Sequence, residues 1–215
     1  MKINKTKSVC VVVNSRANYG RIKSFLSAVD AHPQLSLQLV VGASALLAKY
    51  GGVIDIIEED GFSVNAQLYT IVEGEIPLTM AKSTGLAILE LSTILDSIQP
   101  DLVLTVADRF ETLATAVASS YMNIPLAHTQ GGESTGSIDE SVRHAITKLA
   151  HLHFPATTNA ANNVIRMGEN PDDVFCVGCP SIDLLTGQDL ELPPDIFSKS
   201  GVGATIDENH PLNAQ

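Results

Sequence analysis

The residues best suited to chemistry gather in one stretch, residues 128–148. It starts at the end of an apolar run, crosses a loop with three glycines and enters a helix predicted from its apolar spacing. Ser137 and Glu140 have the spacing of a helix capping box, and Asp139 and Arg143 lie one turn apart. A strand end, a glycine loop and a polar helix N-terminus together are typical of a site for an anionic ligand.

Further polar side chains follow other predicted strands, and the carboxyl ends of parallel strands meet at one edge of a sheet. The candidates at this edge are, in chain order, Arg16, Arg21, Asp108, Arg109, Gln130, Glu133, Asp139, Arg143, His144 and Ser181. Cations beside several carboxylates suit an anionic substrate that undergoes proton transfer. Neighbouring carboxylates raise one another's proton affinity and can supply an acid and a base together.

Each of these residues also has a structural interpretation. Asp108 can cap the helix that follows it, and Asp139 is favourable near a helix N-terminus because of the helix dipole. Glu140, His144 and Lys148 are one turn apart and fit an exposed helix face. The residues alone therefore predict an anion-binding α/β domain and leave open whether it is an acid–base enzyme.

The elements that must position these side chains alternate along the chain. Continuous apolar runs predict strands at 9–13, 35–41, 66–72, 102–106, 125–129, 152–155 and 174–177. Helical spacing predicts helices at 22–29, 43–50, 53–59, 77–98, 111–121, 138–149, 159–167 and 181–185. This alternation predicts the α/β class: a Rossmann-like parallel sheet with helices on both faces and right-handed crossovers.

The character of the sequence changes near its end. Residues 1–186 are expected to form the Rossmann-like domain, whereas 187–215 are rich in proline and glycine with little periodicity. Such composition is typical of a linker or tail.

Composition narrows the range of partners. The 215 residues are 45% hydrophobic, which is ample for a packed core, and 24 acidic against 13 basic residues give a net charge of -11. This charge argues against nucleic-acid partners and anionic membranes. The apolar run 9–13 is too short for a signal peptide, and no apolar segment approaches membrane-spanning length. Three cysteines suit a reducing compartment, so a cytoplasmic location and no membrane partner are expected.

Two small patterns suggest metal or redox chemistry. Cys176 and Cys179 have redox-type spacing, but a redox motif normally opens a helix, whereas Cys176 lies in the predicted strand 174–177 and Cys179 in the turn after it. A small buried thiol at a strand end is therefore the favoured interpretation. His151 and His153 are two apart on a predicted strand and would point the same way, but no further ligand completes a metal site. No metal is expected.

Several ordered motifs carry a more specific signal. They are Ser15–Arg21, Asp108–Ala114, His128–Glu133, Gly136–Ala150 and Gly178–Asp183. Together they resemble the hydrolysing UDP-N-acetylglucosamine 2-epimerases, and most of all the sialic-acid and legionaminic-acid branch of that family. The similarity runs from about Val9 to Leu185.

The resemblance implies one half of a GT-B type fold, in which two Rossmann-like domains face a cleft. This sequence is similar to the N-terminal half, and the C-terminal nucleotide-binding domain is expected to be missing. The implied reaction converts UDP-N-acetylglucosamine and water into N-acetylmannosamine and UDP, by removal of the C2 proton, anti elimination of UDP and hydration. UDP-N,N'-diacetylbacillosamine is the alternative substrate. No cofactor is implied, and the expected partners are the UDP-sugar and either a second copy or a separate C-terminal domain.

The resemblance also implies roles for individual residues. Asp108 and Asp139 match carboxylates of the acid–base steps, Arg16 matches a cation near the diphosphate, and Arg143 matches a helix residue of the motif. The expected substrate-binding set consists of Arg16, Arg21, Arg143, His144 and Ser181.

Two positions depart from the family pattern. Gln130 stands where the family commonly has glutamate, and an amide cannot act as a general base, so either Glu133 takes this role or activity suffers. Arg21 stands where the family usually has lysine, which keeps the charge and changes its geometry. The expected loss of the C-terminal domain, together with Gln130, motivates a second hypothesis: a non-catalytic module that binds a sugar nucleotide or dimerises with a full-length enzyme. A Rossmann-type redox protein is the weakest, because no G-x-G-x-x-G follows the first strand.

Overall fold

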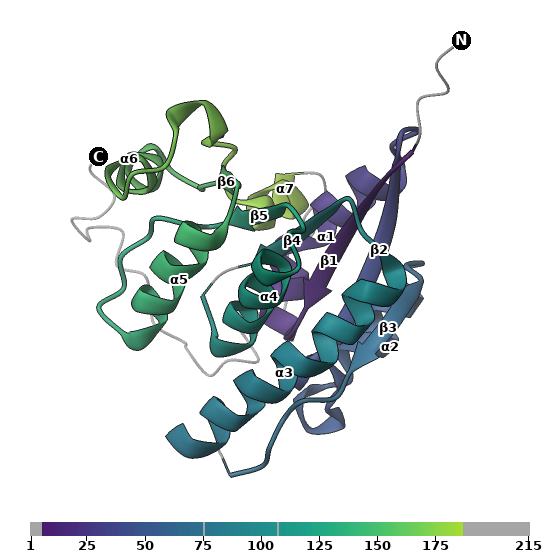
Figure 1. Cartoon of the computed structure of the whole chain (residues 1–215). Coiled ribbons are helices and arrows are strands. Elements are labelled where there is room, and N and C mark those ends of the chain that lie inside the picture. Colours follow the sequence, from purple (N-terminus) through teal and green to yellow (C-terminus); the bar gives the residue numbers. More distant parts are fainter. Residues whose placement is uncertain (1–5, 75, 107, 187–215) are drawn as a thin grey trace, which may run out of the picture. The chain divides into compact units, whose positions relative to one another are not determined.

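The computed structural model describes residues 6–74, 76–106 and 108–186 (Figure 1). Its strands are β1 (Lys7–Val13), β2 (Leu35–Gly42), β3 (Val64–Leu68), β4 (Leu102–Val106), β5 (Leu126–Thr129) and β6 (Leu152–Phe154). Its α-helices are α1 (Arg16–Asp30), α2 (Val53–Glu59), α3 (Pro77–Ile98), α4 (Phe110–Tyr121), α5 (Ile138–Leu149), α6 (Thr158–Arg166) and α7 (Pro180–Thr186). Three short 3-10 helices are η1 (Ala43–Leu46), η2 (Ala48–Tyr50) and η3 (Pro171–Asp173).

The six strands form one parallel sheet in the order β3-β2-β1-β4-β5-β6. This is the strand order of the Rossmann fold, so the expected fold is confirmed. The order reverses between β1 and β4, and the crevice outside the carboxyl ends of these two strands is where such sheets bind ligands.

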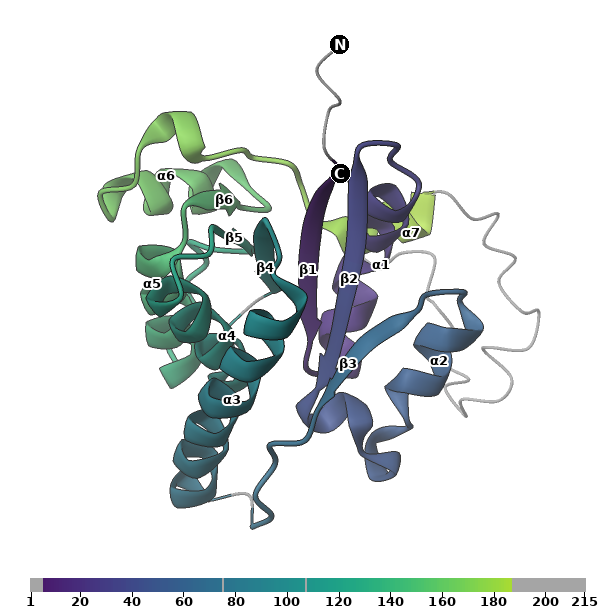
Figure 2. The same ribbon diagram turned by 45° about the vertical axis from the view of Figure 1, so that its right-hand side comes forward.

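Helices cover both faces of the sheet (Figure 2). On one face, Ile22 and Leu26 of α1 and Ile57 of α2 pack against Val9, Val11 and Val13 of β1. On the other face, Leu91 of α3 and Ile146 of α5, together with α4, pack against Cys10 and Val12 of the same strand. Because β1 is buried on both faces, its sequence is apolar at successive positions instead of alternating.

Helix α3 differs from one sequence expectation. Among the described residues it is the one helix long and apolar enough, by length and composition, to cross a membrane. In this fold it serves as the crossover from β3 to β4, and Leu91 and Leu95 are fully buried against the sheet. One side of α3 packs on the sheet through these two leucines, whereas Leu78, Leu86 and Leu89 are exposed.

Four predicted elements are wrong in extent. The helix expected at 22–29 begins at Arg16, with Ser15 as its N-cap, and ends at Asp30. The expected strand at 174–177 is reduced to a single bridge between His153 and Val174, because Pro155 after β6 has no N–H with which to extend the ladder. The expected helix at 43–50 is two 3-10 helices separated by the extended backbone of Leu47. The third strand covers Val64–Leu68, because its partner β2 ends at Gly42, opposite Leu68.

The six strands and helices α1 to α6 lie in the first of the two units into which the chain divides, Met1–Leu184. The linker or tail expected at 187–215 lies outside the described residues.

Candidate active site

The end of β1 places the first candidate, Arg16. Ser15 is the N-cap of α1, and its hydroxyl accepts a hydrogen bond from the Asn18 backbone N–H at 3.2 Å. The carbonyl of buried Asn14 accepts hydrogen bonds from the backbone N–H of Ala45 and from the Ser44 hydroxyl. These contacts fix the turn between β1 and α1, so that Arg16 is held at the crevice.

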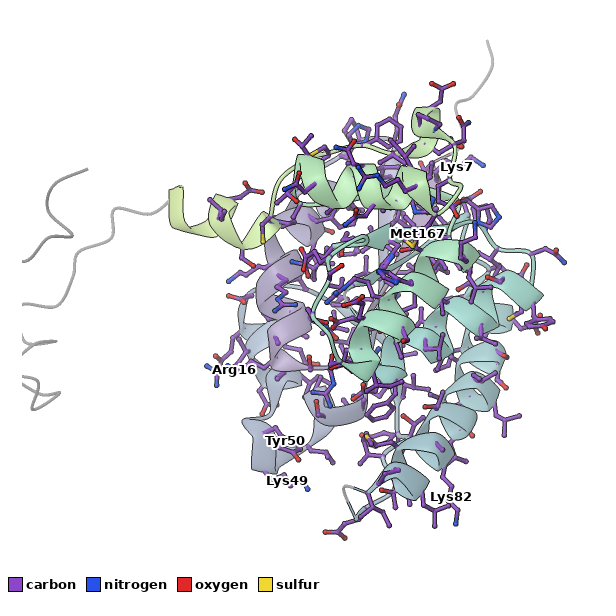
Figure 3. The ribbon with its side chains drawn as sticks, turned by 90° about the vertical axis from the view of Figure 1, so that its left-hand side faces the viewer. Lys7, Arg16, Lys49, Tyr50, Lys82 and Met167 are labelled. Atoms are coloured by element: carbon purple, nitrogen blue, oxygen red, sulfur yellow. The ribbon has the colours of Figure 1, made fainter. Side chains whose placement is uncertain are left out.

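A cavity of about 510 Å³ opens beside Arg16. Its cationic lining residues are Arg16, Lys49 and Arg109. Figure 3 shows Arg16, Lys49 and Tyr50 near one another at the same end of the molecule. The remaining lining residues are Ser15, Ala17, Ser44, Leu47, Tyr50, Ile71, Val72, Glu73, Thr79, Met80, Ser83, Phe110 and Glu111. The cavity can therefore hold an anionic group on one part of its wall and an apolar or hydroxylated group on another.

Beside the cavity residues, Arg143 joins three segments. The guanidinium donates to the Asp108 carboxylate after β4 and, at 2.6 Å, to the carbonyl of Glu133 in the loop after β5. The Arg143 side chain is 4% exposed and that of Asp108 is 18% exposed. Sequence spacing suggested Asp139 as the partner of Arg143, but the guanidinium reaches across to Asp108 instead. Arg143 therefore fixes the position of the Asp108 carboxylate.

The N-terminus of α5 does not form the predicted capping box. Ser137 is the N-cap residue but its side chain makes no capping hydrogen bond. Glu140 instead accepts hydrogen bonds from the backbone N–H groups of Gly136 and Thr135, which hold its pKa below the usual range, with a smaller contribution from His144. Glu140 therefore shapes the glycine loop, and His144 lies beside it on α5.

Gln130 follows β5 with a left-handed backbone, at φ +58°. Its side-chain carbonyl accepts a hydrogen bond from Arg21 at 3.2 Å, and its amide nitrogen lies 3.6 Å from the sulfur of Cys179. Gln130 thus brings together α1, the end of β5 and the segment before α7. Ser181 follows two residues after Cys179 and is half-buried.

The cysteine prediction needs correction. Cys176 is exposed and Cys179 half-buried, because the strand expected to bury them does not form; both thiols are free. The histidine prediction also changes, since His151 precedes β6 and is exposed whereas His153 is buried. His151 accepts a hydrogen bond from the Leu126 backbone N–H, and His153 lies 3.4 Å from a carboxylate oxygen of Glu169.

The glycine loop after β5 is packed tightly against α6. Gly132 has φ +82°, and a Cβ atom there would lie 2.1 Å from the carbonyl oxygen of Ala160. Its own carbonyl accepts a hydrogen bond from the Asn163 side chain at 2.9 Å. The glycine requirement in this part of the motif therefore comes from helix packing, and this packing sets the position of Glu133 next to it.

Glu111, in the first turn of α4, is a lining residue that the sequence did not single out. The residue is 4% exposed, and Arg109 Nε lies 3.3 Å from its Oε2 atom. Burial raises the pKa of Glu111, Arg109 opposes this shift, and the Asp139 carboxylate adds a smaller upward contribution. The signal for its burial was in the sequence, because Glu111 shares a helix face with Ala114, Thr115 and Ala118.

The predicted site residues fall into separate groups. Of the nine in the predicted catalytic and substrate-binding set, Arg16 alone lines the cavity, and Asp108 precedes the lining residue Arg109. Asp108, Arg143 and the Glu133 backbone form one contact network, and Arg21 and Gln130 form another. Asp139 is linked to the cavity through its effect on Glu111. His144 and Ser181 have no contact with either network that the structure records for the described residues.

No group of three or more histidine, cysteine, aspartate or glutamate side chains suited to a metal occurs within the described part of the chain.

Solved structures with the same fold define the class of this domain. The domain superposes with a TM-score of 0.74 and 21% identity on the Neisseria meningitidis UDP-GlcNAc 2-epimerase bound to UDP-GlcNAc, covering 84% of this chain and 49% of that one. For the Rickettsia bellii UDP-N-acetylglucosamine 2-epimerase the TM-score is 0.72 at 20% identity, covering 91% of this chain and 51% of the other. The fold is thus one half of a two-domain GT-B type fold.

Sequence comparison gives the family. Residues 27–209 match the model of the UDP-N-acetylglucosamine 2-epimerase family. The chain is 37% identical to a Legionella pneumophila UDP-N,N'-diacetylbacillosamine 2-epimerase (hydrolyzing), over 82% of this chain and 47% of the relative. It is 29% identical to a Neisseria meningitidis UDP-N-acetylglucosamine 2-epimerase, over 86% of this chain and 48% of the relative.

The chain belongs to the UDP-N-acetylglucosamine 2-epimerase family, and it spans about half the length of the curated relatives it matches.

Proposed function

We propose that this chain supplies the N-terminal half of the active site of a hydrolysing UDP-sugar 2-epimerase. The observation that carries the proposal is the Asp108 carboxylate, which Arg143 fixes at the sheet edge immediately before the cation-lined cavity. Elimination of a nucleoside diphosphate needs a positioned base and fixed cations for the leaving group, and both are available at this edge.

The reaction proceeds in two stages. A carboxylate takes the proton from C2 of the sugar, the C2–H electrons form a C1=C2 double bond, and the C1–O bond breaks so that UDP leaves with its electron pair. Water then adds its oxygen to C1, while a proton is delivered to C2 on the face opposite to the one that was deprotonated. The product is the free 2-epimeric sugar, which is N-acetylmannosamine when the substrate is UDP-N-acetylglucosamine.

We assign the two proton transfers at C2 to Asp108 and Asp139. Asp108 is held in place by Arg143, whereas Asp139 lies in the first turn of α5 and exerts its charge on the cavity residue Glu111. Arg16 and Arg109 lie on the cavity wall, where a guanidinium can make paired hydrogen bonds to phosphate oxygens as negative charge develops on UDP.

Gln130 takes a positioning role in this proposal. Its amide cannot accept the C2 proton, and its carbonyl is already used by Arg21. We therefore infer that it orients Arg21. Glu133 is the nearest acid in the chain to follow it, and the Arg143 contact to the Glu133 carbonyl supports a defined position for this residue.

The Legionella relative supports UDP-N,N'-diacetylbacillosamine as the alternative substrate. Leu47, Ile71, Val72 and Met80 make part of the cavity wall apolar. An apolar wall suits a sugar that carries a methyl group in place of a hydroxymethyl group, because burial of a methyl is favourable and burial of an unpaired hydroxyl is not.

The complete catalytic unit needs the other half of the relatives' length, either as part of the same polypeptide or as a separate chain; a homodimer is a further possible assembly. We place the reaction in the cytoplasm, which the three free thiols support, because free cysteines persist in a reducing compartment.

The proposal is tested by proton exchange at C2. The chain, alone and mixed with the missing half expressed separately, is incubated with each UDP-sugar in deuterium oxide, and deuterium at C2 and released UDP are measured by NMR. We expect deuterium incorporation that is lost in Asp108→Asn. Lack of exchange and of UDP release with both sugars in both settings would refute the proposed activity.

Gln130 favours a second candidate, a non-catalytic module that binds a sugar nucleotide or dimerises. In that case the chain would bind the UDP-sugar, or would dimerise, without exchange at C2. Calorimetry that detects no UDP-sugar binding, together with a monomer in sedimentation, would exclude this candidate.

A further inference from the structure

The buried carboxyl group of Glu111 is not used by the proposed proton transfers. Its side chain is 3% exposed, yet it borders the 510 Å³ cavity. The Oε2 atom is ion-paired with Arg109 Nε at 3.3 Å, and no further donor to it is found among the described residues. A carboxyl oxygen can accept more than one hydrogen bond, so a bound group that donates to this buried oxygen would be stabilised.

The charges around the cavity indicate what kind of group this is. Arg16, Lys49 and Arg109 are suited to the anionic part of a ligand. A phosphate placed against the Glu111 carboxyl group would meet a like charge, whereas a hydroxyl or amide N–H would meet an acceptor. The cavity thus offers cations that suit a phosphate and, beside Arg109, a carboxyl group that suits a neutral hydrogen-bond donor.

We propose that Glu111 is a ligand-binding residue that accepts a hydrogen bond from a hydroxyl or amide N–H of the sugar. This inference rests on the proposed function, because it assumes a sugar phosphate in the cavity. It adds a sugar-reading residue to a site whose other assigned groups act on the C2 proton and on the diphosphate.

The competing explanation is that Glu111 acts only through Arg109. It would then hold the Arg109 guanidinium in position, and its removal would weaken every anionic ligand. The two explanations differ in ligand dependence, because a hydrogen bond to the sugar cannot affect a ligand that has no sugar.

The test compares N-acetylglucosamine 1-phosphate with pyrophosphate, since neither ligand needs a uridine site. Binding to the full 215-residue chain is measured by calorimetry for Glu111→Leu, which removes the acceptor, and for Glu111→Gln, which keeps a side-chain acceptor of similar size. Ser119→Ala is the matched control, because Ser119 is equally buried on α4 and does not line the cavity. Circular dichroism checks that each variant folds, and Glu111→Asp replaces the leucine variant if that one does not.

We expect Glu111→Leu to weaken binding of the sugar phosphate about 10-fold or more, and to weaken binding of pyrophosphate less than about twofold. Glu111→Gln should stay within about threefold of the unaltered chain for both ligands, because its amide oxygen still accepts. Glu111→Asp should weaken the sugar phosphate selectively, since its carboxylate is withdrawn by one methylene.

Parallel weakening of both ligands would overturn the inference in favour of the Arg109 explanation, and unchanged binding of both would overturn it as well. Binding of pyrophosphate but not of the sugar phosphate by the unaltered chain would also overturn it. Failure of the unaltered chain to bind either ligand would instead count against the proposed function, on which the inference depends.

Discussion

Replacement of Arg143 by methionine tests whether the network around Asp108 holds the site together. Methionine keeps most of the side-chain volume and removes the charge, so the Asp108 carboxylate and the Glu133 carbonyl both lose their donor. Removal of one partner of a buried ion pair costs about 3–5 kcal/mol. Because the Asp108 side chain is 18% exposed and keeps some contact with water, the lower end of that range, about 3 kcal/mol, is expected.

The loss is measured by urea unfolding followed by circular dichroism. For a domain of this size it corresponds to a fall in Tm of roughly 6–12 °C. Arg166→Met is the control: Arg166 is exposed at the end of α6, so a change within about 0.5 kcal/mol is expected. In a double-mutant cycle with Asp108→Asn, the double variant should lose about 1.5 kcal/mol or more less free energy of unfolding than the sum of the two single variants. A loss below about 1 kcal/mol, or full additivity, would show that Arg143 does not stabilise a buried pair.

Three further predictions concern the core, the glycine loop and the departure from the family pattern. Burial raises the pKa of the Cys10 thiol from 9.0 to about 12, so the folded state retains a proton that the unfolded chain loses. The free energy of unfolding should therefore fall by up to about 1.4 kcal/mol per pH unit above pH 9, and Cys10→Ala should lack this contribution in alkaline urea titrations. Gly132→Ala should cost more than about 2 kcal/mol in thermal unfolding, because its Cβ meets the Ala160 carbonyl, and an unchanged Tm would contradict the tight loop packing. Gln130→Glu, beside Arg21, should leave deuterium exchange at C2 unchanged, because the proton transfers are assigned to Asp108 and Asp139; an increase would contradict this assignment and show that the site lacks a base at position 130.

Much of the fold was predictable because local pattern and tertiary packing agree. The apolar run of β1 predicts a buried strand, and the apolar spacing in α1 predicts an amphipathic helix. The alternation of strands and helices joined by short loops predicts a parallel sheet. The false strand at 174–177 shows the limit of this reasoning. An apolar run becomes a strand only where its neighbour can both donate and accept, and Pro155, directly after β6, has no N–H to donate.

The site was predictable at the level of the sheet edge but not at the level of contacts. Spacing along α5 suggested Asp139 for Arg143, whereas the guanidinium reaches Asp108 from a different strand end. Long side chains choose partners by distance in space, which periodicity does not give. Glu111 was missed for the same reason: its place on the buried face of α4 was visible, but the cavity that it borders is formed by residues far from it in the sequence.

The two edges of the sheet have a consequence for the behaviour of the domain at high concentration. At one edge β6 is three residues long, ends next to Pro155 and is already hydrogen-bonded by the backbone N–H of Phe175. At the other edge β3 is five residues long, exposes the polar Asn65 and Gln67, and has a register irregularity against β2. Short, irregular or proline-ended edges are poor templates for strand addition, so neither edge favours aggregation by edge-to-edge pairing.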